Sequence, residues 1–148
     1  MSVALLDINV LIALFDPLHL HHEPAHRWFS RNQKHGWASC PLTLNGCIRI
    51  LSNPKYPSFR VSPADVVDHL RQLCSDPHHE FWPADSSLID EALIRAGAIA
   101  NHQCVTDIYL LALAVRHHGK LATFDGSIAL RPVIGATPSN LEVIPAAL

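Results

Sequence analysis

A short apolar run that ends in an acid and passes straight into a helix-length apolar segment opens the chain. Residues 3–6 read VALL, Asp7 follows, and residues 8–15 read INVLIALF with no ordinary loop between them. Ligands of an open α/β sheet bind at the carboxyl ends of its strands. Asp7, with Asn9 two residues further on, is therefore placed for catalysis or metal binding.

Later segments alternate between strand-like and helix-like patterns. Predicted strands occupy residues 3–7, 37–40, 79–82, 120–124 and 141–144. Predicted helices occupy residues 9–15, 23–33, 41–51, 63–73, 86–94 and 108–118. This alternation predicts an α/β sandwich with a mainly parallel sheet. Because no repeat, low-complexity segment or linker interrupts it, residues 1–148 are expected to form a single domain.

A few residues mark the expected ends and contacts of these helices. Pro41 and the pair Ser62-Pro63 are typical of helix starts, and Gly119 is expected to end the last helix. Gly46 lies inside a predicted helix, where glycine costs roughly 1 kcal/mol relative to alanine. We therefore expect another element to pack closely against Gly46.

The composition is that of a globular protein without a strong overall electrostatic field. Hydrophobic residues make up 49% of the chain and charged residues 16%, and the formal net charge is −2. A nucleic-acid partner would therefore depend on a local basic patch. Asp7 and Asp16 interrupt the N-terminal apolar run, so neither a signal peptide nor a membrane span is expected.

Cysteine spacing indicates a reducing compartment. No C-x-x-C pair occurs, so the cysteines are expected to be free thiols in a cytoplasmic protein. The four are Cys40, Cys47, Cys74 and Cys104.

Two further aspartates occupy positions comparable to that of Asp7. Asp107 lies at the start of a strongly apolar predicted helix, and Asp125 follows the predicted strand 120–124. Each has a structural explanation by itself, Asp107 as a helix cap and Asp125 as a turn residue before Gly126. Together, the three acids would meet at one edge of a parallel sheet.

Such a meeting has a chemical consequence. Three negative charges within about 5 Å of one another repel strongly unless a proton or a cation neutralises them. Sites made only of oxygen ligands prefer hard divalent ions such as Mg²⁺ or Mn²⁺. Such an ion can activate water and stabilise charge on a phosphoryl group. The pattern therefore indicates metal-dependent chemistry on phosphate.

Four segments of the chain resemble, in order, the signature segments of PIN-domain nucleases, and most closely those of VapC-type toxins. They are LLDINVLI at 5–12, the segment at 40–51 that begins CPLTLNG, VTD at 105–107 and ATFD at 122–125. The similarity covers nearly the whole chain. It implies a three-layer sandwich with a five-stranded parallel sheet flanked by helices, RNA cleavage that depends on Mg²⁺ or Mn²⁺, an antitoxin partner and a homodimer.

The resemblance also implies roles for individual residues. Asp7, Asp107 and Asp125 match the acids that bind the metal and carry catalysis in the family. Asn9 and Thr106 match polar neighbours that hold ligands or water near the metal. The helix that carries Arg49 lies beside the active site in the family, which makes Arg49 a candidate for contact with RNA.

Position 44 departs from the family pattern. Members usually carry glutamate immediately before the Asn-Gly pair, where this chain has Leu44, and no acid occurs anywhere between Gln33 and Asp65. The missing carboxylate should weaken metal binding, with Asn45 or Asn9 as partial substitutes through neutral oxygens. We therefore expect a three-aspartate site whose activity is reduced or requires a high metal concentration.

Histidine, aromatic and basic residues supply further candidates. None of the 11 histidines has convincing zinc spacing, and His22 and His26 are expected to share a solvated helix face. Tyr56 and Phe59 would either stack on RNA bases or cover the core. Basic residues that could contact phosphate are Arg27, Arg31, Lys34, Arg49, Lys55, Arg60 and Arg131.

Three functions remain open from the sequence. The first is an active metal-dependent endoribonuclease toxin. The second, motivated by Leu44, is a catalytically weak PIN domain that mainly binds RNA or its antitoxin. The third is a phosphohydrolase or receiver-like protein with Asp7 as nucleophile, which requires a catalytic lysine. Lys120 is the only candidate near a strand, and it begins that strand instead of ending it.

Overall fold

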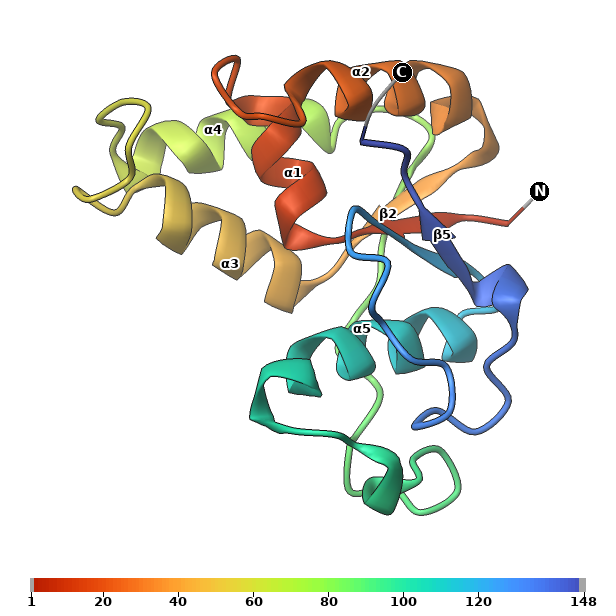
Figure 1. Cartoon of the computed structure of the whole chain (residues 1–148). Helices are drawn as coiled ribbons and strands as arrows, with labels where there is room; N and C mark the ends of the chain where they lie inside the picture. Colours follow the sequence, from red (N-terminus) through yellow and green to blue (C-terminus); the bar gives the residue numbers. More distant parts are fainter. Residues whose placement is uncertain (1, 147–148) are drawn as a thin grey trace.

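The computed structural model describes residues 2–146, in which a five-stranded sheet lies between two layers of helices (Figure 1). The strands are β1 (Ala4–Leu6), β2 (Trp37–Ser39), β3 (His79–Phe81), β4 (Lys120–Thr123) and β5 (Leu141–Val143). The helices are α1 (Ile8–Phe15), α2 (His22–Asn32), α3 (Pro41–Leu51), α4 (Pro63–Leu73) and α5 (Val105–Arg116). No helix within residues 2–146 combines the length and the apolar composition needed to cross a bilayer.

The sheet is parallel throughout, with the strand order β3-β2-β1-β4-β5. The N-terminal strand β1 is central, since Leu5 pairs with Ala38 of β2 and with Leu121 of β4. A central parallel strand is covered on both faces, which explains why residues 3–6 are all apolar. The predicted α/β class is confirmed, and the sheet is entirely rather than mainly parallel.

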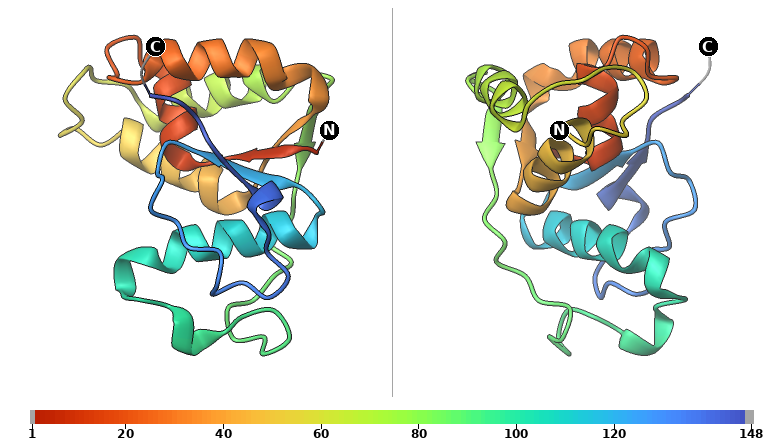
Figure 2. Two further views of the ribbon diagram at one scale, coloured as in Figure 1. Left: turned by 45° about the vertical axis from the view of Figure 1, so that its right-hand side comes forward. Right: turned by 90° about the vertical axis from the view of Figure 1, so that its left-hand side faces the viewer.

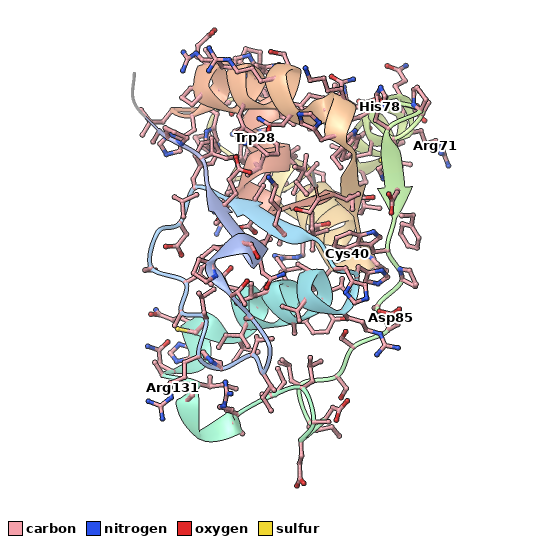
Figure 3. The ribbon with its side chains drawn as sticks, turned by 90° about the vertical axis from the view of Figure 1, so that its right-hand side faces the viewer. Trp28, Cys40, Arg71, His78, Asp85 and Arg131 are labelled. Carbon is pink, nitrogen blue, oxygen red and sulfur yellow. The ribbon has the colours of Figure 1, made fainter. Side chains whose placement is uncertain are left out.

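Successive residues of the central strands face two separate cores. Ala4 and Leu6 pack with α1, α2, α3 and α4, whereas Leu5 and Leu121 pack with α5. Figure 2 shows this division, with α5 on the opposite side of the sheet from the other four helices. Figure 3 labels Trp28, which belongs to α2, and Cys40, which lies near α5, and the two residues belong to different cores.

Several local predictions are confirmed. Helix α3 begins at Pro41, and Ser62 caps α4 by accepting a hydrogen bond from the Asp65 N–H at 3.1 Å. Gly46 lies where a Cβ would be 2.7 Å from Cδ1 of Ile8, so its close packing joins α3 to α1. All four cysteines are free.

Helix α5 differs from its prediction at both ends. It begins at Val105, so Asp107 lies in the first turn and is not the capping residue. At the other end His118, not Gly119, has the left-handed backbone conformation, with φ of 57°. Gly119 is required for a different reason, because a Cβ there would lie 2.5 Å from the Val3 carbonyl oxygen.

The helix predicted over residues 86–94 is wrong; the segment forms turns. The Ser87 hydroxyl accepts a hydrogen bond from the Ile89 N–H, and the Asp90 carboxylate accepts one from the Ala92 N–H. Such side-chain bonds compete with helical ones. Ile94 then forms an isolated antiparallel bridge with Val133, a distant contact that no local pattern reveals.

Candidate functional site

Asp7 lies at the junction between β1 and α1. Its N–H continues the sheet by donating to the Ala122 carbonyl at 3.0 Å, while its Oδ1 accepts from the Ile8 N–H at 2.7 Å and caps α1. The side chain is only 5% exposed. One residue therefore ends the central strand and starts the helix, which fixes the carboxylate at the carboxyl edge of the sheet.

The Thr123 hydroxyl joins Asp7 to the end of the neighbouring strand. It donates to Asp7 Oδ2 at 2.7 Å and accepts from the Asp125 N–H at 3.0 Å. Thr123 is buried at the last position of β4. This single hydroxyl therefore fixes the position of Asp125 relative to Asp7, although the two aspartates follow different strands.

Asp125 is held in turn by Ser127. Its Oδ1 accepts from both the backbone N–H and the hydroxyl of Ser127, at 2.8 Å and 2.6 Å. These two bonds stabilise the ionised form and lower the pKa of Asp125. Asp125 is thus the member of the set that keeps its negative charge most readily.

Asp107 approaches from the opposite side of the sheet, in the first turn of α5. Burial raises its pKa to about 6, and the negative charges of Asp7 and Asp125 add to the effect. Burial likewise raises the pKa of Asp7, against the hydrogen bonds from Thr123 and Ile8, and Asp125 adds repulsion. The structure therefore brings all three predicted aspartates within electrostatic reach of one another.

The three carboxylates fit a hard divalent cation by charge and by donor chemistry. In the described part of the chain, no lysine, arginine or histidine forms an ion pair with any of them. Within residues 2–146, however, no three His, Cys, Asp or Glu side chains form a group that could bind a metal ion together. Each carboxylate keeps lone pairs that are free to accept from a further ligand.

The raised pKa of Asp107 predicts a pH-dependent gain in stability for Asp107→Asn. A folded-state pKa of about 6, above the ordinary 3.8, means that ionisation destabilises the fold. This cost is absent below about pH 4, grows between pH 4 and 6, and is complete above pH 6. In EDTA at pH 7.5, urea unfolding should show a gain of about 1 kcal/mol, a figure limited by the partial exposure of the side chain.

That gain should disappear at pH 4. Asp68→Asn is the matched control, because Asp68 is exposed and pairs with Arg71 on the surface of α4. An equal gain for Asp107→Asn at both pH values would show that the pKa of Asp107 is not raised in the folded protein.

The predicted supporting residues lie on the surface around this edge. Asn9 and Thr106 are exposed in the first turns of α1 and α5, and Asn45 is exposed on α3. Asn45 and Thr106 line one hollow of about 410 Å³ between α3 and α5. Arg49 is exposed further along α3 and has no ion-pair partner within residues 2–146.

Leu44 is partly buried near the start of α3. It packs against the core beneath α1 and, with Ile48 and Leu70, lines an apolar groove between α3 and α4. The same helix meets α1 where Gly46 contacts Ile8, the residue after Asp7. Position 44 therefore lies on the helix that packs beside Asp7, and the Leu44 side chain itself packs against the core and the groove between α3 and α4.

Two candidate groups have structural roles instead. His22 and His26, predicted to be solvated, donate ring N–H groups to the carbonyls of Ala13 and Leu14, at 2.7 Å and 2.8 Å, and so hold α2 to the end of α1. The Tyr56 hydroxyl donates to the buried carboxylate of Asp16. Tyr56 and Phe59 also pack against the core, which agrees with a covering role.

Lys120 does not support covalent phosphoryl chemistry at Asp7. It begins β4 and forms an ion pair with Glu142 of β5. Because β1 and β4 are parallel, Lys120 lies at the amino end of the sheet and Asp7 at the carboxyl end.

Sequence reasoning missed Thr123 and Ser127. A usable signal was present in the order Thr-Phe-Asp-Gly-Ser at 123–127. Thr123 is two residues before Asp125 and Ser127 two residues after it, a spacing typical of side-chain turns around an aspartate.

Comparisons with known proteins identify the family of the chain. The family model described as PIN domain matches residues 4–131. Ribonuclease VapC44 of Mycobacterium tuberculosis is 45% identical over 95% of this chain and 99% of its own length. The same organism's ribonucleases VapC39 and VapC38 are 44% and 39% identical over 85% of this chain, with 91% and 87% of their own lengths covered. The chain therefore belongs to the PIN-domain family, and within it to the VapC group.

Proposed function

We propose that this chain is a cytoplasmic, metal-dependent endoribonuclease toxin that an antitoxin protein silences, and that it acts as a homodimer. The relatives named above are ribonucleases by name, and the chain covers nearly all of their length. The observation that carries the proposal is the set of three aspartates near one edge of the sheet, where burial, with added repulsion from Asp7 and Asp125, raises the pKa of Asp107 to about 6.

Asp7, Asp107 and Asp125 are the residues proposed to hold Mg²⁺ or Mn²⁺. When bound, such an ion would activate water and stabilise the charge that develops on the phosphodiester. Two hydroxyl groups orient these carboxylates: Thr123 donates a hydrogen bond to Asp7, and Ser127 donates one to Asp125. Asn9, Asn45 and Thr106 offer neutral oxygens nearby, and Arg49 offers a positive charge for an RNA phosphate.

Leu44 supports a second candidate, a PIN domain that binds RNA or its antitoxin and cuts weakly. Its apolar packing between α3 and α4 leaves α3 without the carboxylate that the family usually has there. A site with three acids instead of four should bind metal less tightly.

A metal titration with an RNA substrate tests the proposal and separates the two candidates. The purified chain is incubated with structured RNAs in EDTA and in rising Mg²⁺ or Mn²⁺, and products are resolved on a sequencing gel. The toxin hypothesis expects cuts that appear with metal and are absent in EDTA. Metal-dependent binding of RNA without any cut at millimolar Mn²⁺ would favour the second candidate.

A further inference from the structure

Two arginines of α2 line a hollow that also contains the end of β5. Arg27 and Arg31 are four residues apart, so their side chains share one face of the helix. The hollow has a volume of about 280 Å³, and Trp28 and Ile144 are among its walls. Among residues 2–146, no acidic side chain lines this space, called here the α2 hollow. Two positive charges therefore border it without a negative side chain beside them.

The guanidinium groups of Arg27 and Arg31 are available to an anion. Four other arginines use their donors on carboxylates or backbone carbonyls, namely Arg60, Arg71, Arg95 and Arg116. Neither Arg27 nor Arg31 forms an ion pair in the part of the chain that the structure describes. Each guanidinium presents five N–H donors in a planar fork that matches the oxygens of a phosphate.

The α2 hollow belongs to a basic segment of a chain that is acidic overall. Residues 22–35 contain Arg27, Arg31 and Lys34 but only one acid, Glu23, whereas the formal net charge of the whole chain is −2. The three aspartates repel an RNA backbone, so its attraction has to come from a local positive surface. The exposed face of α2 supplies such a surface.

The neighbouring strands β4 and β5 connect the α2 hollow to the aspartates. The Ile144 N–H donates to the Thr123 carbonyl at 2.7 Å, and the Thr123 hydroxyl binds Asp7. The Phe124 ring stacks on that of His21, the residue before α2, with ring centroids 4.6 Å apart. Figure 1 shows the chain after β5 running toward α2. The α2 hollow therefore adjoins the carboxyl edge of the sheet, where the aspartates lie.

We propose that Arg27 and Arg31 bind a phosphodiester of single-stranded RNA other than the one that is cut. The inference rests on the proposed ribonuclease function and deepens it, because it assigns the substrate a second contact, on α2. Proteins that bind single strands commonly present a positive surface that follows the backbone. Contacts to phosphate fix the position of a nucleic acid without reading its sequence. The arginines would thus hold the strand across the edge of the sheet.

The chemistry of the α2 hollow suits a sugar–phosphate backbone. Arginine is favoured wherever two parallel hydrogen bonds recognise a phosphate, and two guanidinium groups one helical turn apart can share its oxygens. Pro24, Trp28 and Ile144 add apolar surface that the carbons of a ribose can contact. Carboxylates of an acidic protein also suit arginine, but the position beside the proposed nuclease site favours RNA.

The first test measures RNA binding in EDTA and does not depend on cleavage. A labelled single-stranded RNA of about 12 nucleotides is titrated at several salt concentrations. Arg27→Gln combined with Arg31→Gln should weaken binding by about tenfold or more in low salt. The slope of log affinity against log salt should become shallower by about 1.4, since each phosphate contact to a single strand contributes about 0.7. An unchanged affinity and slope would overturn the proposal.

A matched control removes the same charge from another part of the surface. Arg71 and Arg116 are exposed and already pair with Asp68 and Asp85. Arg71→Gln combined with Arg116→Gln should therefore leave both the affinity and the slope nearly unchanged. An equal loss in this control would show that net charge governs binding and that the α2 hollow does not.

A polyglutamate peptide of the same charge as the RNA tests the other kind of partner. It should bind the unmodified protein more weakly than the RNA does. If it binds as tightly as RNA, and Arg27→Gln with Arg31→Gln removes that binding, the α2 hollow is a site for an acidic protein and the RNA assignment is wrong.

The second test compares the cleavage of substrates of two lengths in Mn²⁺. A dinucleotide has a single phosphodiester, so it cannot reach the aspartates and the α2 hollow with two different phosphates. Arg27→Gln combined with Arg31→Gln should raise the KM for the longer RNA about tenfold with kcat unchanged, as expected when binding energy common to substrate and transition state is lost. Cleavage of the dinucleotide should not change. An equal effect on both substrates, or on neither, contradicts the assignment.

The two tests separate this inference from the proposed function. RNA binding that depends on Arg27 and Arg31 without any cleavage would support the phosphate site and remove the nuclease proposal. Cleavage that the two substitutions leave unaltered for both lengths of RNA would do the reverse.

Discussion

Asp7→Asn is expected to abolish RNA cleavage, with a loss of about a thousandfold or more. Asp7 is the buried central member of the acidic set, and its amide replacement removes the negative charge that a divalent cation needs. The amide oxygen can still accept the Ile8 N–H, so the cap of α1 should survive. The effect should therefore be chemical and not a failure to fold.

Cleavage of an RNA substrate in Mn²⁺ measures this effect, with thermal unfolding followed in parallel. Asp68→Asn makes the same chemical change at an exposed position of α4 and should leave cleavage unaltered. If Asp7→Asn cuts RNA as fast as the unmodified protein, the aspartate site is not the nuclease site.

Leu44→Glu is expected to raise metal affinity and cleavage, each by about tenfold or more. The substitution supplies the fourth carboxylate on α3, the helix that packs against α1 next to Asp7 through Gly46 and Ile8, and the glutamate side chain has to turn away from the α3–α4 groove that Leu44 lines. It also removes the apolar contacts that Leu44 makes with the core, so the unfolding temperature should fall in metal-free buffer.

Leu44→Gln separates charge from packing. Glutamine loses the same apolar contacts without adding a carboxylate, so it should destabilise the protein and leave the Mn²⁺ affinity unchanged. The affinities can be measured by calorimetry. If Leu44→Gln improves binding as much as Leu44→Glu, or neither improves it, the missing glutamate does not limit this site.

Much of the fold could be predicted because its signals are local. Each of three signals depends only on residues next to it in the sequence: the apolar run at 3–6, Pro41 and the capping serine Ser62. The strand and the two helices that they predict lie where expected. The helix predicted over 86–94 was wrong because the apolar spacing there suits a helix, whereas the side chains of Ser87 and Asp90 accept hydrogen bonds from nearby N–H groups and form turns. Ile94 is then held by Val133, and such distant pairing leaves no local mark.

The candidate site divides in the same way. Acids at strand ends and helix starts could be read from the sequence, and the structure brings Asp7, Asp107 and Asp125 within electrostatic reach. The groups that orient these aspartates could not be predicted from the sequence, because the role of Thr123 depends on its hydrogen bond to Asp7, which lies 116 positions earlier.

The pairing of β1 with β4 has a consequence for how the protein is made. A ribosome adds roughly 5–20 residues per second, and the amino-terminal strand leaves it long before its neighbour β4 exists. A chain interrupted before residue 125 lacks the last aspartate, and one interrupted before residue 120 lacks the strand that completes the centre of the sheet as well. Translation must therefore run nearly to its end before the acidic edge can assemble, so an unfinished chain lacks the set of aspartates on which the proposed cleavage depends.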